Sequence, residues 1–463
     1  MKKVRWIVTM VVGMLLVGAW GIAAAEMLVV TTTDYASGNV TTLTDRGSTV
    51  AKDLLSIHSD NAIAAYGEYI YVLEKFGADN VIKVKADDIA PSGVIYQYSV
   101  GNGANPQGMV FLNDRKAYVS QYGDSMLWIV DPGAMSEEGF KIGKVDLSAY
   151  ADGDGLPEMS PMALVEGKLY VGCQRLDRDN NWIPLDAQVV IIDTATDEVT
   201  GAITLQKGNP QAMVAYGGKL YVTSGGSLFD PTDGGIEVID TTTDTYAGLL
   251  LAESDLGGNV GGLLFRSATK GYVIVGNWPD YVVRPFDPST GDVGAVLPGA
   301  KAASSMVLGG DGVLYVADRS QEQPGIYMYD AEDTLIAGPI ATGLPPNALV
   351  VVGGAPPTAV AEEMSRIQPK THALGSNYPN PFNAGTVIPY VIAGSDRIEV
   401  DLSIYTTLGQ RIATLVQGTR PAGRYLAHWN GTNRAGQPVS SGVYVARLNA
   451  GGSVYTVKLV LTR

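Results

Sequence analysis

The sequence predicts an all-β fold in which a seven-bladed β-propeller is followed by a small β-sandwich. Three observations support this prediction. The composition, with 56 Gly and 24 Tyr in 463 residues, favours short strands joined by tight turns. A phrase of about fifty residues recurs between residues 26 and 353, as in repeat folds. A second set of short alternating segments fills residues 374–463.

Each repeat has the pattern of a four-stranded propeller blade. In the fullest copy, residues 209–214 form a first strand, a glycine turn leads to the second strand at 220–222, and residues 235–240 form the third. Apolar residues alternate with period two, so one set of side chains can face a neighbouring blade. Most motif residues are therefore expected to serve packing or turns. The repeats place a tyrosine in the second strand every 43 to 52 residues, at Tyr71, Tyr118, Tyr170, Tyr221, Tyr272 and Tyr315.

The two ends of the repeat region are incomplete and complementary. Residues 346–351 have the pattern of a lone innermost strand. Residues 27–30, 38–43 and 54–57 have the pattern of second, third and fourth strands without a first. Joined together, these segments predict a seventh blade closed by both ends of the propeller region, 26–353. Such closure removes the exposed sheet edges through which β-proteins associate.

The repeat phrases P-x-x-M-V, L-Y-V and V-I-D-T-x-T-D-x-V resemble the YVTN-type, or surface-layer-like, β-propeller family. The resemblance covers about 325 residues. It implies the propeller fold and, because members are mostly secreted or periplasmic and many have no known activity, interaction rather than chemistry. Two copies depart from the family's pattern, since residues 60–63 and 259–262 lack its proline.

The last ninety residues form a separate β-domain after a predicted linker at residues 354–373. Several short strands and one tryptophan, Trp429, predict a sandwich with its own core. The phrases N-Y-P-N-P-F-N, I-Y-x-x-L-G-Q, W-N-G and S-G-V-Y resemble the type A sorting domain of the type IX secretion system. That domain is similar to the immunoglobulin-like domain of flagellar hook-capping proteins. The resemblance implies passage across the outer membrane and recognition by the secretion machinery through the last strand, including Lys458, Leu459 and Val460. A plain immunoglobulin-like domain without a sorting role is the alternative.

The amino terminus predicts export. A basic start, an apolar run over residues 7–19 and three alanines ending at Ala25 have the order of a signal peptide, predicted over residues 1–25. An uncleaved anchor is the alternative. Cleavage would change the formal charge from −15 to −18, because Lys2, Lys3 and Arg5 are removed. So acidic a chain argues against nucleic-acid binding. We expect a protein at the cell surface, reached through the periplasm, with no transmembrane segment after cleavage.

Catalytic motifs are scarce in the sequence. The three histidines have no metal-ligand spacing, and the single cysteine, Cys173, lies in a predicted core strand. We therefore expect no cofactor, with calcium as the one candidate ion. Asp152, Asp154 and Glu158 stand in a glycine-rich run that resembles the start of a calcium loop, although the full pattern is absent. An acidic turn between strands explains the run equally well.

Aligning the repeats on the apolar residue of the first strand places small residues at the mouth of the predicted channel. Most of them can form hydrogen bonds, and they could bind a ligand in the channel mouth. The alternative is that they cap the turn into the first strand. The aligned positions are Ser59, Asn105, Ser160, Asn209, Asn259, Ala302 and Pro345.

Together these patterns predict a non-catalytic binding or scaffold module that recognises a protein or glycan through one face of the propeller. The longest insertions, at residues 135–158 and 176–187, are where we expect the partner surface. Trp182 is the candidate contact residue, with packing on the blade as its alternative. A metal-assisted hydrolase or lactonase is the alternative function, and a structural role in an envelope layer is a third. The sequence names neither the ligand nor the oligomeric state.

Overall fold

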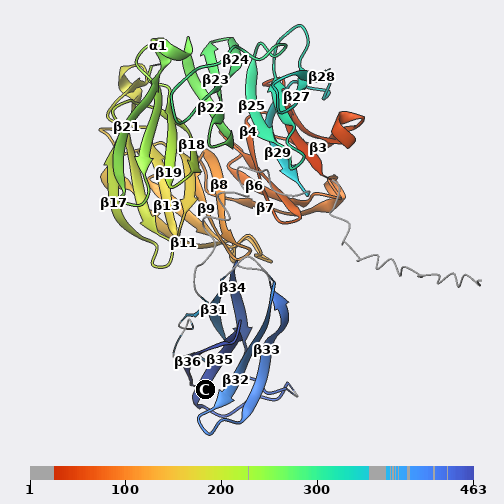
Figure 1. Cartoon of the computed structure of the whole chain (residues 1–463), viewed down its shortest axis with the longest axis vertical. Helices are drawn as coiled ribbons and strands as arrows, with labels where there is room; N and C mark the ends of the chain where they lie inside the picture. Colours follow the sequence, from red (N-terminus) through yellow and green to blue (C-terminus); the bar gives the residue numbers. More distant parts are fainter. Residues whose placement is uncertain are drawn as a thin grey trace, which may run out of the picture. The chain divides into compact units, whose positions relative to one another are not determined.

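The computed structural model of the chain describes residues 26–227, 229–353, 372–375, 377, 380, 382–383, 385–393, 397–420, 423–434 and 436–462. The predicted signal peptide and residues 354–371 of the predicted linker lie outside these residues. The chain forms two compact units that divide between Ala359 and Val360 (Figure 1), and each is described by itself. Within the described residues no helix is long and apolar enough to cross a membrane.

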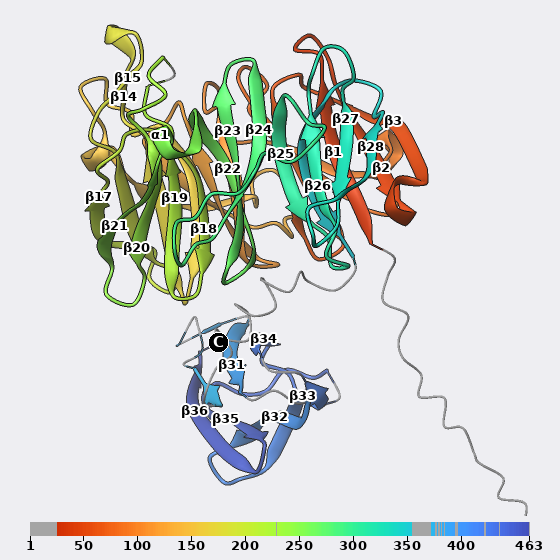
Figure 2. The same cartoon turned by 45° about the horizontal axis from the view of Figure 1, so that its top comes forward.

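The first unit is a seven-bladed β-propeller, as the sequence predicts (Figure 2). Blade 5 has three strands, and an isolated bridge from Phe286 to Val293 lies where its fourth would be. In chain order the blades consist of β4 (Asn61–Tyr66), β5 (Tyr69–Glu74), β6 (Asn80–Lys85) and β7 (Val94–Ser99) in blade 1; β8 (Pro106–Asn113), β9 (Lys116–Gln121), β10 (Met126–Val130) and β11 (Lys141–Asp146) in blade 2; β12 (Met159–Val165), β13 (Lys168–Cys173), β16 (Gln188–Asp193) and β17 (Glu198–Thr204) in blade 3; β18 (Pro210–Tyr216), β19 (Lys219–Ser224), β20 (Gly235–Asp240) and β21 (Thr245–Ala252) in blade 4; β22 (Asn259–Ser267), β23 (Lys270–Asn277) and β24 (Asp280–Phe286) in blade 5; β25 (Ala303–Leu308), β26 (Leu314–Asp318), β27 (Gly325–Tyr329) and β28 (Leu335–Ile340) in blade 6; and β29 (Pro346–Val352), β1 (Met27–Thr33), β2 (Gly38–Thr44) and β3 (Thr49–Ile57) in blade 7.

Blade 7 joins the two ends of the propeller region. The innermost strand β29 pairs antiparallel with β1, so that Val29 lies opposite Val350. The backbone N–H of Thr33 donates to the carbonyl of Pro345 at 2.8 Å and extends the pairing by one step. Without β29, the inner edge of β1 would expose its unpaired backbone groups.

The seven blades divide their turns between two faces of the disc because successive strands run in opposite directions. The turns between second and third strands lie on one face, together with the loops that lead into the next blade. We call this the mouth face. The turns between first and second strands and between third and fourth strands lie on the opposite face.

Neighbouring blades pack through apolar clusters that alternate along each strand. The cluster between blades 7 and 1, for example, contains Val29, Val40, Ile70 and Val72, all fully buried. Burial of one such side chain contributes about 1.5–3 kcal/mol, so the repeated clusters provide most of the stability. The six tyrosines that mark the repeat all lie in second strands and are buried.

Three of these tyrosines also bond to the next blade. The hydroxyl of Tyr170 in blade 3 donates to Asp244 of blade 4 at 2.5 Å, and Lys168 forms an ion pair with the same carboxylate at 2.6 Å. Asp244 has φ of 55°, a left-handed conformation that turns its carboxylate back toward the preceding blade. We call this pair of contacts, a tyrosine hydrogen bond and a lysine ion pair to one aspartate of the next blade, a latch. Equivalent latches join Tyr118 and Lys116 to Asp197, and Tyr272 and Lys270 to Asp333.

The second unit is a two-sheet β-sandwich. One sheet has the order β30-β31-β34 and the other β33-β32-β35-β36. Their shared core contains Trp429, as the sequence predicts, whose ring packs at a tilt against Phe382 and edge-to-face against Tyr444. The strands are β30 (Ala373–Leu374), β31 (Thr386–Ile392), β32 (Ile398–Thr406), β33 (Arg411–Arg420), β34 (Gly423–Trp429), β35 (Gly442–Ala450) and β36 (Ser453–Leu461). Strand β30 takes in Ala373, the last residue of the predicted linker, because it pairs with Val391.

The latches give a test of how the blades are held together. Tyr170→Phe keeps the ring but removes the hydrogen bond to Asp244, and we expect it to lower the free energy of unfolding by about 1.5 kcal/mol. Tyr221→Phe is the matched control, because Tyr221 packs on Phe265 and has no aspartate partner among the described residues. Denaturant unfolding of both variants measures the difference. Equal losses for the two would contradict a stabilising role of the latch.

Candidate functional site

The polar residues predicted at the channel mouth lie at or beside the starts of innermost strands. The first-strand residue that pairs with the third residue after the repeat tyrosine, such as Pro106 or Pro210, defines a common register for the blades, and the ring residue of each blade is the one before it. In that register, Asn105, Asn209 and Asn259 are equivalent, together with Ala302 and Pro345. Ser59 and Ser160 are not.

The ring as predicted is therefore wrong at two positions. Asp60 replaces Ser59, because β4 pairs with β5 without the β-bulge found in the first strands of blades 2 to 6. Glu158 replaces Ser160, because in blade 3 Met162, and not Leu164, is the equivalent apolar residue. Asn105, Glu158 and Asn209 share a left-handed conformation with φ of 49°, 46° and 61°, as expected for equivalent residues.

The asparagines of this ring bond to neighbouring turns. Asn209 donates from Nδ2 to the carbonyl of Gly226 at 3.0 Å, and its Oδ1 accepts from Gln211 at 2.7 Å. Asn105 accepts the equivalent bond from Gln107 at 2.9 Å. These contacts favour the turn-capping alternative, and the ligand role of the ring stays a prediction.

Buried carboxylates hold the inter-blade loops on the mouth face. Glu237 accepts from the backbone N–H groups of Gln206 and Lys207, and Asp318 accepts from those of Lys301 and Ala302. Glu253 accepts from Gly234 and Val260 in the same way, and Glu74 accepts from His58. Each carboxylate satisfies backbone amides that strand pairing leaves free. The loops therefore have fixed positions.

The residues of the calcium hypothesis meet at an arginine. The Nε of Arg178 lies 2.9 Å from Glu158 Oε1 and 3.3 Å from Asp154 Oδ2. Asp152 Oδ1 accepts the backbone N–H of Asp154 at 3.1 Å. Burial raises the pKa of Glu158 to about 7 and also raises that of Asp152. No group of three or more His, Cys, Asp or Glu side chains suited to a metal ion is found in the described part of the chain.

The same arginine fixes the loop that carries Trp182. Arg178 donates to the carbonyl of Tyr122 at 2.8 Å, and its guanidinium lies over the Trp182 ring at 5.1 Å. The loop contains two short strands, β14 (Leu176–Asp177) and β15 (Ile183–Pro184), which project from the disc in Figure 2. Trp182 remains 50% exposed. It is thus held in place from one side and open to solvent on the other.

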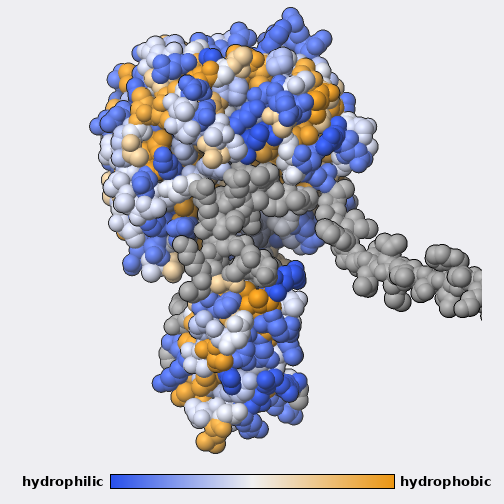
Figure 3. All heavy atoms as spheres, viewed as in Figure 1, coloured by the Kyte–Doolittle hydropathy of each residue, from blue (hydrophilic) through white to orange (hydrophobic). Residues whose placement is uncertain are grey.

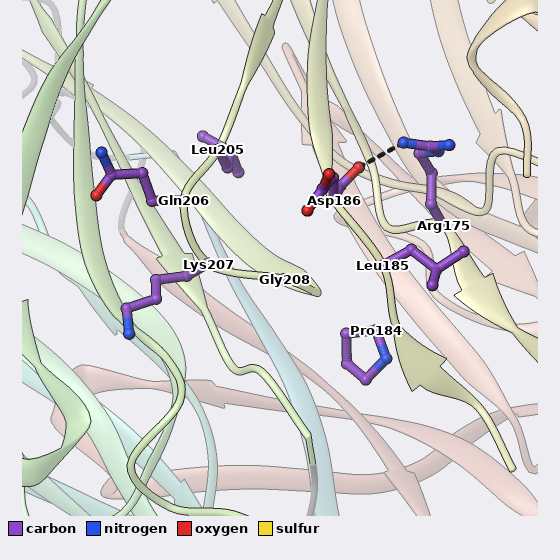
Figure 4. A pocket seen from close by; sticks show the side chains of 8 residues that line it. All are labelled: Arg175, Pro184, Leu185, Asp186, Leu205, Gln206, Lys207 and Gly208. Atoms are coloured by element: carbon purple, nitrogen blue, oxygen red, sulfur yellow. Dashed lines mark hydrogen bonds between the residues drawn. The ribbon is translucent and has the colours of Figure 1, made fainter.

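The Trp182 loop forms one wall of a cleft. The cleft measures about 500 Å³ and lies between the β13–β16 loop and the loop that joins blade 3 to blade 4 (Figure 4). Arg175 donates to the backbone carbonyl of Asp186 at 2.7 Å across the first wall. The lining residues are Arg175, Pro184, Leu185, Asp186, Leu205, Gln206, Lys207 and Gly208.

The partner surface predicted over residues 135–158 needs a correction. Part of that segment is not an insertion, since Lys141–Asp146 is the fourth strand β11 of blade 2. The residues before β11 lie on the opposite face, and those after it lie on the mouth face with the acidic run. Only the second part and the 176–187 loop share a face.

Cys173 is a core residue, as the sequence suggests. Its side chain is fully buried among Leu169, Val171 and Val190. Burial raises the pKa of its thiol to about 12, so the nucleophilic thiolate is scarce.

The predicted sorting residues lie in β36, an edge strand of the sandwich. Lys458 is exposed and Leu459 is buried. Asn380, from the N-Y-P-N-P-F-N phrase, covers the outer edge of this strand by bonding to the carbonyl of Lys458 and the N–H of Val460. Phe382 adds two backbone bonds to the same edge.

Sequence reasoning missed one feature of the mouth face. Exposed aromatic side chains stand in the second-to-third turns of several blades besides blade 3, for example Phe76 and Trp278. The sequence does contain a signal for these residues, namely an aromatic residue in a polar turn a few positions after the repeat tyrosine. It went unnoticed because the turns have no sequence pattern in common.

Comparison with known proteins supports the fold of both units. Residues 386–453 match the family model of the FlgD Ig-like domain. The propeller is similar in structure to a candidate 6-phosphogluconolactonase of Bacteroides uniformis, with TM-score 0.54, 12% identity, and coverage of 71% of this chain and 99% of that one.

Two further solved structures are similar at TM-score 0.50. One is a candidate 6-phosphogluconolactonase of Bacteroides fragilis, with 12% identity and coverage of 71% and 98%. The other is a protein of unknown function from Desulfotomaculum acetoxidans, with 11% identity and coverage of 71% and 99%. At such identity the likeness shows the fold alone. No curated protein matches the chain.

The acidic run gives a metal test. Arg178 already supplies positive charge between Asp154 and Glu158, so we expect millimolar calcium to leave the melting temperature unchanged. Thermal melts with calcium, and after chelation, measure this. A calcium-dependent rise of several degrees, which Asp152→Asn abolishes, would support the calcium hypothesis instead.

The buried acids give a pH test. The pKa values of Glu158 and Glu253 in the folded protein are raised by burial to about 7, above the ordinary value of 4.5. The folded state therefore holds these protons more tightly. The two raised pKa values therefore add to the free energy of unfolding, fully below pH 4.5, and this contribution is lost as the pH rises to 7. We expect the melting temperature to fall over that range, and to fall less steeply in Glu158→Gln. Equal slopes for the two proteins would contradict the assignment.

Proposed function

We propose that the chain is an exported, surface-attached β-propeller that acts as a non-catalytic binding or scaffold module, with its partner on the mouth face. The observation that carries this proposal is Trp182. Its ring is half exposed and stacked on Arg178, and other residues of its loop form one wall of the cleft of Figure 4. A rigid aromatic side chain that is open to solvent next to a concave surface is typical of a recognition site.

The buried acids of the mouth face favour binding over hydrolysis. Glu237 and Glu253 have a structural task, since each accepts two or more hydrogen bonds from backbone amides or Ser224 that hold the loops. The names of two similar structures keep a lactonase as the alternative. Their identity is too low to carry that activity to this chain.

Export is the second part of the proposal. The predicted signal peptide would bring the chain to the periplasm, and the C-terminal unit would then act as the sorting domain. Its independent core supports a separable role. In this proposal the secretion machinery recognises β36, where Lys458 is exposed beside the edge that Asn380 covers.

The sorting role predicts where variants end up in the native host. Deletion of residues 374–463 should leave the propeller in the periplasm. Lys458→Glu should reduce surface display, whereas Arg447→Glu, an exposed charge reversal on the neighbouring strand β35, should not. Cell fractionation and surface labelling measure the distribution. Unchanged display of the truncated chain would refute the sorting role.

A further inference from the structure

The exposed aromatic side chains of the propeller gather on one face. All five that are exposed among the described propeller residues stand in second-to-third turns, each in a different blade. They are Tyr35 (79% exposed), Phe76 (74%), Trp182 (50%), Phe229 (82%) and Trp278 (78%). Turns of the opposite face carry Thr and Asp instead, as at residues 194–197 and 241–244. Packing and chance exposure do not explain so one-sided a distribution, which is typical of an interaction surface.

Two of these rings stand in turns whose other residues line clefts of similar construction. The cleft near Trp182 has Arg175, Asp186 and Gln206 in its walls. A second cleft, of about 380 Å³, lies against the Trp278 turn and has Arg284, Asp280 and Asn277 in its walls. Each cleft thus combines a guanidinium, a carboxylate and an amide, and an exposed tryptophan stands in one of the turns that line it.

We propose that these two clefts bind a neutral, hydroxyl-rich glycan, with Trp182 and Trp278 as stacking platforms; this inference rests on the proposed function. The C–H face of a pyranose ring is apolar and weakly positive, and it stacks on the negative face of an indole. Sugar hydroxyls are both donors and acceptors, so they pair with guanidinium, carboxylate and amide groups together.

The charge and spacing of the face favour a glycan over other partners. The chain carries a formal charge of −15, so a polyanion would be repelled. A protein partner is generally held by a central, dehydrated cluster of anchors. Here the rings are separated, one to a blade, by polar turns. An extended chain of repeating units can contact such separate platforms one after another.

Affinity electrophoresis tests the inference directly. Mature protein, residues 26–463, is run in gels that contain hydroxyethyl cellulose, xyloglucan, galactomannan or dextran, with polygalacturonate as the anionic comparison. We expect at least one neutral polysaccharide to retard the protein. Trp182→Ala and Trp278→Ala should each weaken binding about tenfold, a loss typical of an aromatic anchor. Met135→Ala, 94% exposed on the opposite face, should have no effect. Thermal melts confirm that each variant is folded.

Retardation by none of the neutral polysaccharides, or equal retardation of the tryptophan variants, would overturn the inference. A second arm separates its failure from that of the proposed function. Labelled protein is added to host cells treated with periodate, which oxidises glycans, or with protease. Trp182-dependent binding that periodate abolishes supports the glycan. Binding that only protease abolishes identifies a protein partner, so the glycan fails while the binding function stands. No Trp182-dependent binding to untreated cells would refute both.

Discussion

The innermost strands of the propeller lie at the edges of their sheets, and this determines how the blades bond to one another. Each borders the channel and has a sheet partner on one side only, so its other backbone groups need partners from elsewhere. Side chains of the preceding blade supply them. Ser120 donates to the carbonyl of Ser160, Gln174 to that of Pro210, and Thr223 to that of Gly261.

These hydrogen bonds between blades continue across blade 7, where the two ends of the propeller region meet. Ser304 of blade 6 donates to the carbonyls of Pro346 and Asn347 in blade 7, and Asn347 donates in turn to the carbonyl of Asn61 in blade 1. At these five junctions a side chain of one blade bonds to the innermost strand of the next, and blade 7 takes part only because β29 pairs with β1. Closure is therefore a condition for all the blades, and it fixes the loops of the mouth face.

The sequence was sufficient to predict the fold because the signal is repeated. In every blade except blade 7, a tyrosine marks the second strand, and these tyrosines are about fifty residues apart. The incomplete segments at the two ends of the propeller region complement each other and form blade 7. The position of single residues around the channel was harder to predict. Ser59 was misplaced because blade 1 lacks a bulge that the next five blades have, and a bulge depends on strand pairing more than on residue type.

Contacts between distant residues account for the rest. Nothing near Asp154 and Glu158 in sequence shows that Arg178 would lie between them, because the 174–187 loop must first fold against the acidic run. The family resemblances, to YVTN-type propellers and to type A sorting domains, stay predictions. The Ig-like fold of residues 386–453 is confirmed.

The two faces of the disc differ in how freely they can change. On the opposite face, Asp197, Asp244 and Asp333 bond to the preceding blade, so substitutions in those turns weaken the disc. On the mouth face, buried carboxylates at the loop bases hold the backbone, so exposed side chains at the turn tips contribute less to stability. An exposed tip such as that of Phe229 can therefore vary at little cost in stability, whereas the Tyr35 ring also packs against the Arg319 guanidinium at 4.5 Å. A face with fixed loop bases and free tips is where a propeller can acquire recognition, and it is the face on which the aromatic side chains stand.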